Sequence, residues 1–475
     1  MNRIAQSAFA FTLLAASVIA PAQDVGAPKD RSERPECKAH GAQEPECTSA
    51  YMRIPSTAQR DNRVAQQIFR GDHVLIRSAT VHTAGTAGTL KDTDVLVQGG
   101  IIRAIGKQLA APAGTTLIDA NGAPLTPGLF AGITGIGIEE VSAEPSTNDT
   151  ALAFGATPPQ AAQMRPEFDV TMAYNPRSSL LPVARMGGLS FTQLAAGSMP
   201  GGSIIAGQGG LVRLDGSFDA FTGQRALFVN LGGNLAPLGG NSRAGEYMLL
   251  AQAIAEARSA APVGSANTLL TPIGRSTLAG YLGHGRVLVG VDRAADILRV
   301  IDIAQREKLN IVLVGAAEGW VVAGQLAAAN VPVLIDGLEN LPGSFDSLGA
   351  TLENAARLHA AGVAIGFSQR GDASHNARKI RQLAGNAVAN GLPWEAGLAG
   401  LTAVPAKALG VGDRLGSIEV GKLADLVLWS GDPLDVSSTA RQIWLGGKAM
   451  PMQSRQTLLR DRYLRAAGAL PRAYP

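Results

Sequence analysis

The chain has 475 residues, of which 46% are hydrophobic and 17% charged, and it contains 57 glycines. This composition suits a compact, loop-rich globular protein and excludes a disordered or fibrous one. The formal net charge of +3 includes 41 Lys and Arg, which are scattered without a basic run, so a nucleic-acid-binding protein is not indicated. At this length we expect two or three domains, or one large barrel with an accessory domain.

The first 22 residues have the pattern of a secretory signal peptide. Arg3 supplies the positive start, the apolar segment FAFTLLAASVIA follows, and Ala20-Pro21-Ala22 fits the small-x-small cleavage pattern. This apolar run is short for a membrane span, and no later segment reaches about 18 uninterrupted apolar residues. We therefore predict a periplasmic or secreted protein that begins near Gln23 and has no membrane span after cleavage, with an uncleaved anchor as the alternative.

The two cysteines, Cys37 and Cys47, lie in a duplicated Pro-Glu-Cys unit shortly after this segment. In an oxidising compartment we expect them to form a disulfide that closes a small loop. A metal site would need more ligands than His40 adds. Residues 23–70 are polar and interrupted by proline, which indicates an extended arm.

Two β-rich ends flank the rest of the chain. Short alternating runs follow the arm, two of them joined by the hairpin signal Gly99-Gly100, and similar runs with turn glycines lie near the C-terminus. We predict one composite β-sandwich, built from residues 71–126 and 416–475, into which the middle of the chain is inserted.

The middle of the chain, residues 127–415, alternates between strand-like and helix-like segments. The strand-like segments include 189–197, 286–291, 310–318, 331–337 and 363–371, and the helix-like ones include 179–188, 245–260, 293–308, 319–330, 352–362 and 376–391. Asp292 is the predicted N-cap of one of these helices. The alternation indicates a parallel α/β fold, and about 290 residues fit a (β/α)8 TIM barrel. An open doubly wound sheet is the alternative, weakened because no G-x-G-x-x-G follows a strand at the right place.

Five segments carry the signature of a known family. They read VLVQGGIIRAIG, LIDANGAPLTPGLF, NPRSSLLPVARMGGLS, GGSIIAGQGGLVRLDG and LTAVPAKALGVGDRLGSIEVGKLADLVLWSGDPLD. In these segments the chain resembles the amidohydrolase superfamily and, within it, the imidazolonepropionase-like and prolidase-like members. The resemblance covers nearly everything after residue 70. It implies the barrel-plus-sandwich architecture and the hydrolysis of carbon–nitrogen bonds in amides, cyclic amides or peptides.

The resemblance also implies a divalent metal, often zinc, at the C-terminal mouth of the barrel, where it activates water and polarises the scissile carbonyl. Its ligands are expected from His-x-His after strand 1, sometimes a lysine or acid on strand 4, histidines on strands 5 and 6, and an aspartate after strand 8. Strand 4 apart, these positions fall on Ile133, Gly135, Gly290, Gly315 and Gln369. None is a good ligand for a dication, and no lysine lies between Lys107 and Lys308, so we predict that metal-dependent catalysis has been lost.

Other residues rebuild such a site only in part. His375, with Asp372, follows the last predicted barrel strand, but two residues fall short of the three protein ligands of a catalytic zinc. His284 precedes a strand and so belongs to the opposite end of the barrel. Ser368 lacks the G-x-S-x-G of a nucleophile elbow. We expect no cofactor, and zinc only if the site is rebuilt; an active amidohydrolase with a rebuilt or metal-independent site is the alternative.

Polar residues near predicted loop or strand ends are candidate ligand-binding residues, although each could also be an ordinary loop residue. They are Asn175, Arg177, Gln208, Asp292, Arg293, Ser368 and His375. Arg177 could pair in bidentate fashion with the carboxylate of a peptide-like ligand. We predict a binder of a small amide- or peptide-like molecule, or a non-catalytic partner of an intact amidohydrolase paralogue or of a second copy of itself.

Overall fold

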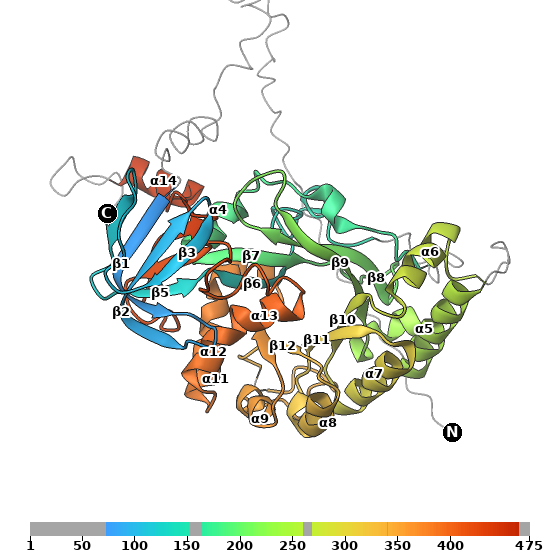
Figure 1. Ribbon diagram of the computed structural model, residues 1–475. Coiled ribbons are helices and arrows are strands. Elements are labelled where there is room, and N and C mark those ends of the chain that lie inside the picture. Colours follow the sequence, from blue (N-terminus) through green and yellow to red (C-terminus); the bar gives the residue numbers. More distant parts are fainter. Residues whose placement is uncertain (1–72, 153–163, 260–267, 340, 465–475) are drawn as a thin grey trace, which may run out of the picture. The chain divides into compact units, whose positions relative to one another are not determined.

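The computed structural model describes residues 73–152, 164–259, 268–339 and 341–464. The predicted signal peptide, the arm and the Cys37–Cys47 pair lie outside these residues. Within the described part the named strands form two sheets of eight strands each (Figure 1).

The first sheet is assembled from both ends of the chain. Its strands are β1 (His73–His82), β2 (Thr89–Gln98), β3 (Ile101–Gly106), β4 (Thr116–Asp119), β5 (Pro124–Pro127), β14 (Leu426–Trp429), β15 (Ala440–Leu445) and β16 (Lys448–Ala449). β5 joins the two ends because it pairs with β1 on one side and with β14 on the other. The register of β1 shifts after Ile76, so that its first half pairs with β4 and its second half with β5. The predicted sandwich is thus one branched, mixed sheet, with Val95, Leu125 and Leu426 in its core.

The second sheet forms the barrel. Its strands are β6 (Leu129–Thr134), β7 (Leu189–Leu194), β8 (Ile205–Arg213), β9 (Phe221–Asn230), β10 (Arg286–Val291), β11 (Asn310–Gly315), β12 (Val333–Ile335) and β13 (Ile365–Phe367). They follow chain order across the sheet, which begins with β6 and ends with β13. The prediction of a barrel inserted between the two halves of a composite β-rich domain is confirmed.

One barrel strand runs against its neighbours. β8 is antiparallel to both β7 and β9, whereas the other neighbouring pairs are parallel. The connections before and after β8, residues 195–204 and 214–220, contain no helix, and parallel strands need a longer crossover between them. The expected parallel order therefore holds elsewhere in the sheet but not at β8.

Helices cover the outer side of the barrel sheet (Figure 1). They include α4 (Leu180–Met186), α5 (Arg243–Arg258), α6 (Pro272–Tyr281), α7 (Ala294–Glu307), α8 (Ala323–Ala328), α9 (Asn354–Ala360), α11 (Ile380–Ala389) and α12 (Trp394–Gly400). Successive side chains of a strand face opposite sides of its sheet. In β10, Val287 and Val289 belong to the core that includes these helices, whereas Leu288 joins Phe130 and Phe228 in a second core.

Shorter elements complete the described chain. They are η2 (Pro145–Thr147), η4 (Val170–Ala173), η5 (Gly233–Gly239), η6 (Gly319–Val322), α10 (Ala373–Asn376), η7 (Ala377–Lys379), α13 (Ala403–Ala408) and α14 (Arg455–Tyr463). α13 supplies Ala406 to the core that contains Leu288, and the adjoining Leu409 and Val411 pack there as well. α10 follows β13 directly, which brings its side chains close to the end of β6.

The start of α7 differs from the prediction. Its N-cap is Arg293, whose own side chain makes no capping hydrogen bond. Asp292 turns instead to the loop after β11, where its Oδ1 accepts a hydrogen bond from the amide of Ala317 at 3.3 Å. Glu318 accepts the hydrogen bond of the Ala294 amide at 3.0 Å. The predicted capping role of Asp292 is therefore wrong, because another carboxylate reaches the helix start and Asp292 is left for the barrel mouth.

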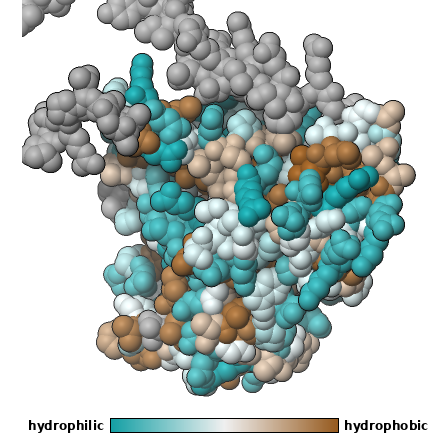
Figure 2. Space-filling model, turned by 90° about the vertical axis from the view of Figure 1, so that its left-hand side faces the viewer, coloured by the Kyte–Doolittle hydropathy of each residue, from teal (hydrophilic) through white to brown (hydrophobic). Residues whose placement is uncertain are grey.

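Figure 2 shows the side of the molecule on which β1 and β2 lie, where hydrophilic residues cover much of the described surface and hydrophobic residues form separate groups. Among the described helices, none has the length and apolar character needed to cross a bilayer.

Candidate functional site

The candidate site lies at the end of the barrel where the parallel strands finish. Parallel strands place their carboxyl ends on the same face, so the segments that follow β6, β10, β11, β12 and β13 meet there. Two groups of charged side chains occupy this mouth. One surrounds Arg370 and the other surrounds His375.

The five positions expected for metal ligands offer almost no donor atoms. They are Ile133 in β6, Gly135 just after it, Gly290 in β10, Gly315 at the end of β11 and Gln369 just after β13. The Oε1 atom of Gln369 is buried and has no hydrogen-bond partner within the described residues. At Gly290 a Cβ atom would lie 2.6 Å from Oδ1 of Asn230, so a larger residue would have to displace that side chain.

The space for a side chain at Gly315 is already occupied. Gly315 has φ of +100°, and a Cβ atom there would lie 2.6 Å from Oδ1 of Asp292 and against the guanidinium of Arg370. Arg370 forms an ion pair with Asp292, and its Nε is 3.3 Å from Oε2 of Glu339, without hydrogen-bond geometry. Its amide donates to Oδ2 of Asp336 at 3.0 Å. One arginine thus lies among three carboxylates that follow β10 and β12.

Arg370 remains a cation in this setting. Burial opposes its charge, but Asp292 and Glu339 outweigh that effect and raise the pKa of its guanidinium. Burial raises the pKa of Glu339, against the opposing influence of Arg370. A divalent ion placed beside Gly315 would meet a permanent positive charge and four positions without a side-chain donor. The residues at the family positions therefore do not fit the expected metal.

The second group consists of Glu139, Asp372 and His375. One side-chain ligand atom from each lies within 4.8 Å of the others. Nδ1 of His375 is 2.8 Å from Oδ1 of Asp372, and Nε2 is 2.9 Å from the carbonyl oxygen of Glu140. Oε2 of Glu139 accepts a hydrogen bond from the hydroxyl of Ser374 at 2.6 Å. The three residues could hold a cation only if the ring of His375 gave up one of its two acceptors.

The acceptors around His375 favour its charged form. Burial alone would lower its pKa, but the Glu140 carbonyl and the Asp372 carboxylate outweigh burial and raise it. Both ring nitrogens are donors in the imidazolium, so each acceptor is satisfied in that form. For Asp372, hydrogen bonds from His375 and Ser142 outweigh partial burial and lower the pKa. This group thus contains its own cation.

Ser142 brings a hydroxyl to the same group, but the arrangement is not a catalytic triad. Its Oγ lies 3.2 Å from Nδ1 of His375 and donates to Oδ1 of Asp372 at 3.1 Å. In a triad the serine and the acid bind opposite nitrogens of the imidazole. Here both meet Nδ1, so His375 is not placed to activate the serine.

The seven predicted ligand-binding residues divide into two sets. Asp292, Ser368 and His375 lie at the mouth, where Ser368 accepts a hydrogen bond from the amide of Ile133 at 3.1 Å. The remaining four belong to neither charged group, and they are Asn175, Arg177, Gln208 and Arg293.

These four residues have local contacts of their own. Arg293 forms an ion pair within the first turn of α7. Gln208 in β8 accepts a hydrogen bond from Tyr281 of α6 at 2.8 Å. Asn175 accepts a hydrogen bond from the amide of Arg177 at 2.9 Å, on an exposed segment after η4. The sequence pattern did not distinguish these four residues from the three at the mouth, and only their tertiary contacts do.

Two residues that organise the mouth were missed by sequence reasoning. Arg370 directly follows Gln369, so a cation beside a position where a metal ligand was expected was a usable signal. Ser374 carried no such signal. Its hydroxyl accepts a hydrogen bond from the amide of Gly135, which is 239 residues away in the chain.

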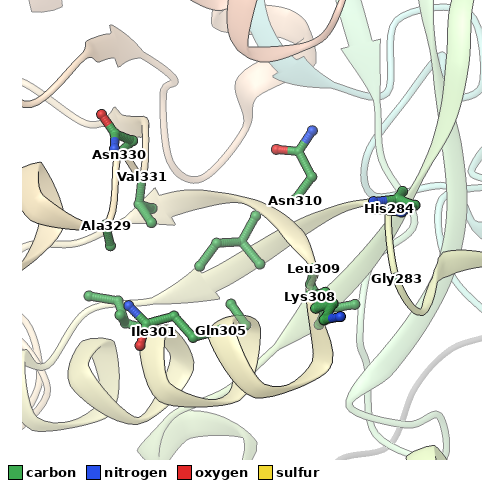
Figure 3. A pocket seen from close by; sticks show the side chains of 12 residues that line it. Gly283, His284, Ile301, Gln305, Lys308, Leu309, Asn310, Ala329, Asn330 and Val331 are labelled. Atoms are coloured by element: carbon green, nitrogen blue, oxygen red, sulfur yellow. The ribbon is translucent and has the colours of Figure 1, made fainter.

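A separate pocket of about 420 Å³ lies at the opposite end of the barrel, where β10 and β11 begin (Figure 3). Gln305 and Lys308 of the α7 end and Asn310 of β11 line it. His284 lies at the same end, as the sequence predicted. This pocket is therefore distinct from the mouth, where the carboxyl ends of the strands meet.

Known proteins match parts of this sequence. Residues 291–453 match the Amidohydrolase family. Amidohydrolase tasK from Hapsidospora irregularis is 49% identical over 59 residues, which are 12% of this chain and 6% of that protein. An imidazolonepropionase from Aromatoleum aromaticum is 43% identical over 109 residues, 22% of this chain and 25% of that protein. The chain thus matches a quarter or less of the length of each of these relatives.

The fold is shared over a longer stretch. An amidohydrolase from Thermotoga maritima MSB8 has a TM-score of 0.69 and 24% sequence identity, over 80% of this chain and 100% of that chain. At this identity the similarity establishes the architecture alone.

Proposed function

We propose that this chain, a member of the amidohydrolase superfamily, lacks the catalytic metal centre and binds a small amide- or peptide-like molecule without hydrolysing it. Members of this superfamily would use a metal-bound water for that hydrolysis. The proposal therefore rests on what occupies the barrel mouth in place of such a centre.

The observation that carries the proposal is the position of Arg370 against Gly315. A ligand side chain at position 315 and the Arg370–Asp292 ion pair would need the same space. A guanidinium is charged at every physiological pH, so Arg370 permanently offsets one of the three nearby carboxylate charges. Its positive charge also repels a cation placed beside Gly315.

Gln369 supports an amide-like ligand. Its buried Oε1 has no partner among the described residues, and a buried acceptor without a partner costs about 1–3 kcal/mol. An amide N–H of a bound ligand would satisfy it. Family membership favours the same ligand class, because amidohydrolases act on amide-type bonds.

A second candidate function is an amidohydrolase with a rebuilt site. Glu139, Asp372 and His375 bring three potential ligand atoms together, and three protein ligands suffice for a catalytic zinc. Against it stand the two hydrogen bonds of the His375 ring, because a metal bound to either ring nitrogen would have to replace one of them.

The metal content of the purified full-length chain tests these candidates directly. We expect elemental mass spectrometry to find only substoichiometric zinc, nickel and manganese. Stoichiometric metal would contradict the proposal. If that metal is lost in His375→Gln and Asp372→Asn, the rebuilt site is correct; if it is retained in both, the ion binds elsewhere.

Ligand binding needs its own measurement. We expect some members of a panel of dipeptides and N-acyl amides to raise the melting temperature without being hydrolysed. Gln369→Leu should abolish this shift, because it removes the free acceptor, whereas Gln305→Leu at the opposite end should retain it. Hydrolysis of the same ligands, or an unchanged shift in Gln369→Leu, would overturn this part of the proposal.

Export is part of the same proposal and is supported by the pattern of the first 22 residues. Expression of the full chain in a Gram-negative host should yield a periplasmic protein whose first residue lies near Gln23. A cytoplasmic product that retains Arg3 would contradict export.

A further inference from the structure

The two end strands of the barrel sheet, β6 and β13, are not joined by a backbone ladder within the described residues. The gap between them would leave backbone amides of β6 and its following segment without partners, which is costly in a buried place. Side chains from the segment after β13 bind these groups instead.

Ser368 makes the first of these contacts. It is buried, and its Oγ accepts a hydrogen bond from the amide of Ile133 at 3.1 Å. The approach is close, since a Cβ atom at Gly132 would lie 3.3 Å from the same Oγ. Gly132 has φ of +87°, a conformation that favours glycine. Glycine at position 132 thus allows the β6 backbone to come close enough for the amide of Ile133 to bind Ser368.

Ser374 makes the second contact from α10. Its Oγ accepts a hydrogen bond from the amide of Gly135 at 2.9 Å and donates to Oε2 of Glu139 at 2.6 Å. All three residues are buried. One hydroxyl therefore serves as both acceptor and donor, which satisfies a backbone amide and a carboxylate together.

His375 makes the third contact, one residue further along α10. Its Nε2 meets the carbonyl oxygen of Glu140 at 2.9 Å, while Asp372 holds the other ring nitrogen. Nearer the surface, the hydroxyl of Ser142 donates to Asp372 at 3.1 Å. The contacts between the two segments thus run from the barrel interior to its rim.

We infer that Ser368, Ser374 and His375 form a clasp that closes the barrel between β6 and β13 and holds the segment after β6 at the mouth. The clasp binds the backbone of positions 133 and 135 rather than their side chains. Because these contacts use the backbone, the segment after β6 can keep its position at the mouth with isoleucine at position 133 and glycine at position 135. The inference does not depend on the proposed function, because every contact lies within the chain.

Site-resolved hydrogen exchange of the full-length chain tests the clasp. In Ser374→Ala the amide of Gly135 loses its acceptor, so we expect its exchange to become about tenfold faster. Ser374→Thr keeps the hydroxyl and should restore protection. Ser203→Ala is the matched control: its Oγ donates to the Ile205 carbonyl at 2.6 Å, away from this gap. It should leave the amides of positions 133 and 135 unchanged.

The result that overturns the inference is equal exchange of Gly135 in wild type and Ser374→Ala, or equal acceleration in Ser203→Ala. Ser368→Ala repeats the measurement at Ile133 and keeps the test decisive if Ser374→Ala does not fold. Because exchange of the Ile133 and Gly135 amides is read in the apo chain, failure here is distinct from the discovery of a bound metal, which would contradict the proposed function.

Discussion

The two sides of the barrel mouth differ in what stands in place of the expected ligands. On the side of β10 and β11, the glycines at 290 and 315 leave volume, which the long side chain of Arg370 and its partner Asp292 fill at Gly315. On the side of β6 and β13, the backbones approach closely, so short hydroxyls reach the amides directly. Where the backbones lie apart, long charged side chains occupy the positions expected for ligands. Where the backbones lie close together, short hydroxyl side chains form hydrogen bonds there.

The largest expected effect comes from refilling the space at Gly315. Gly315→Ala adds a Cβ at positive φ, against Asp292 and Arg370. We expect a loss of about 2–3 kcal/mol in the free energy of unfolding, measured in urea. Gly324→Ala is the control, because that glycine lies in α8 with open space around it, and it should stabilise the protein slightly. Similar effects at both positions would mean that Gly315 is not special.

Removal of Arg370 should have a smaller effect. Arg370→Met leaves Asp292 and Glu339 without their cation, at a cost of about 1–2 kcal/mol, reduced because 43% of the arginine side chain is exposed. Arg299→Met, in an exposed pair, should change stability by less than about 0.5 kcal/mol. In the Arg370→Met background the cost of Gly315→Ala should shrink, and strict additivity would argue against a shared space.

The side of β6 and β13 should respond to pH through His375. Its pKa is raised in the folded state, so its stabilising contribution is complete below the unfolded pKa of about 6.5 and is lost as pH rises through the folded pKa. The groups that face it are Asp372, Glu139 and the Glu140 carbonyl. The stability difference between wild type and His375→Gln, below about 1 kcal/mol, should therefore decrease from pH 6 to pH 9. His284→Gln, at the other end of the barrel, should show no such trend.

The smallest expected effect is that of a chelator. If the mouth holds no metal, dialysis against EDTA should leave the melting temperature unchanged, because no bound ion contributes to the folded state. A drop that is reversed by added zinc would show that a metal stabilises the fold.

The sequence predicted the scaffold well because its signals are local. Apolar runs such as 286–291, with a helix after them, identify barrel strands from periodicity alone. It missed the reversed strand β8, since strand direction depends on how the chain returns between strands and not on the strand's own residues. It misplaced Asp292, because the competing carboxylate of Glu318 comes from a loop after another strand.

By itself the sequence predicted a barrel inserted in a composite β-domain and a resemblance to amidohydrolases, with Ile133, Gly135, Gly290, Gly315 and Gln369 where ligands were expected. Only the tertiary structure decided what occupies the mouth. The contacts of Arg370 with Asp292 and of Ser374 with Gly135 join residues 78 and 239 positions apart. The local sequence pattern does not predict such partners, because the distance between the two residues of each pair is set when the strands close into a barrel.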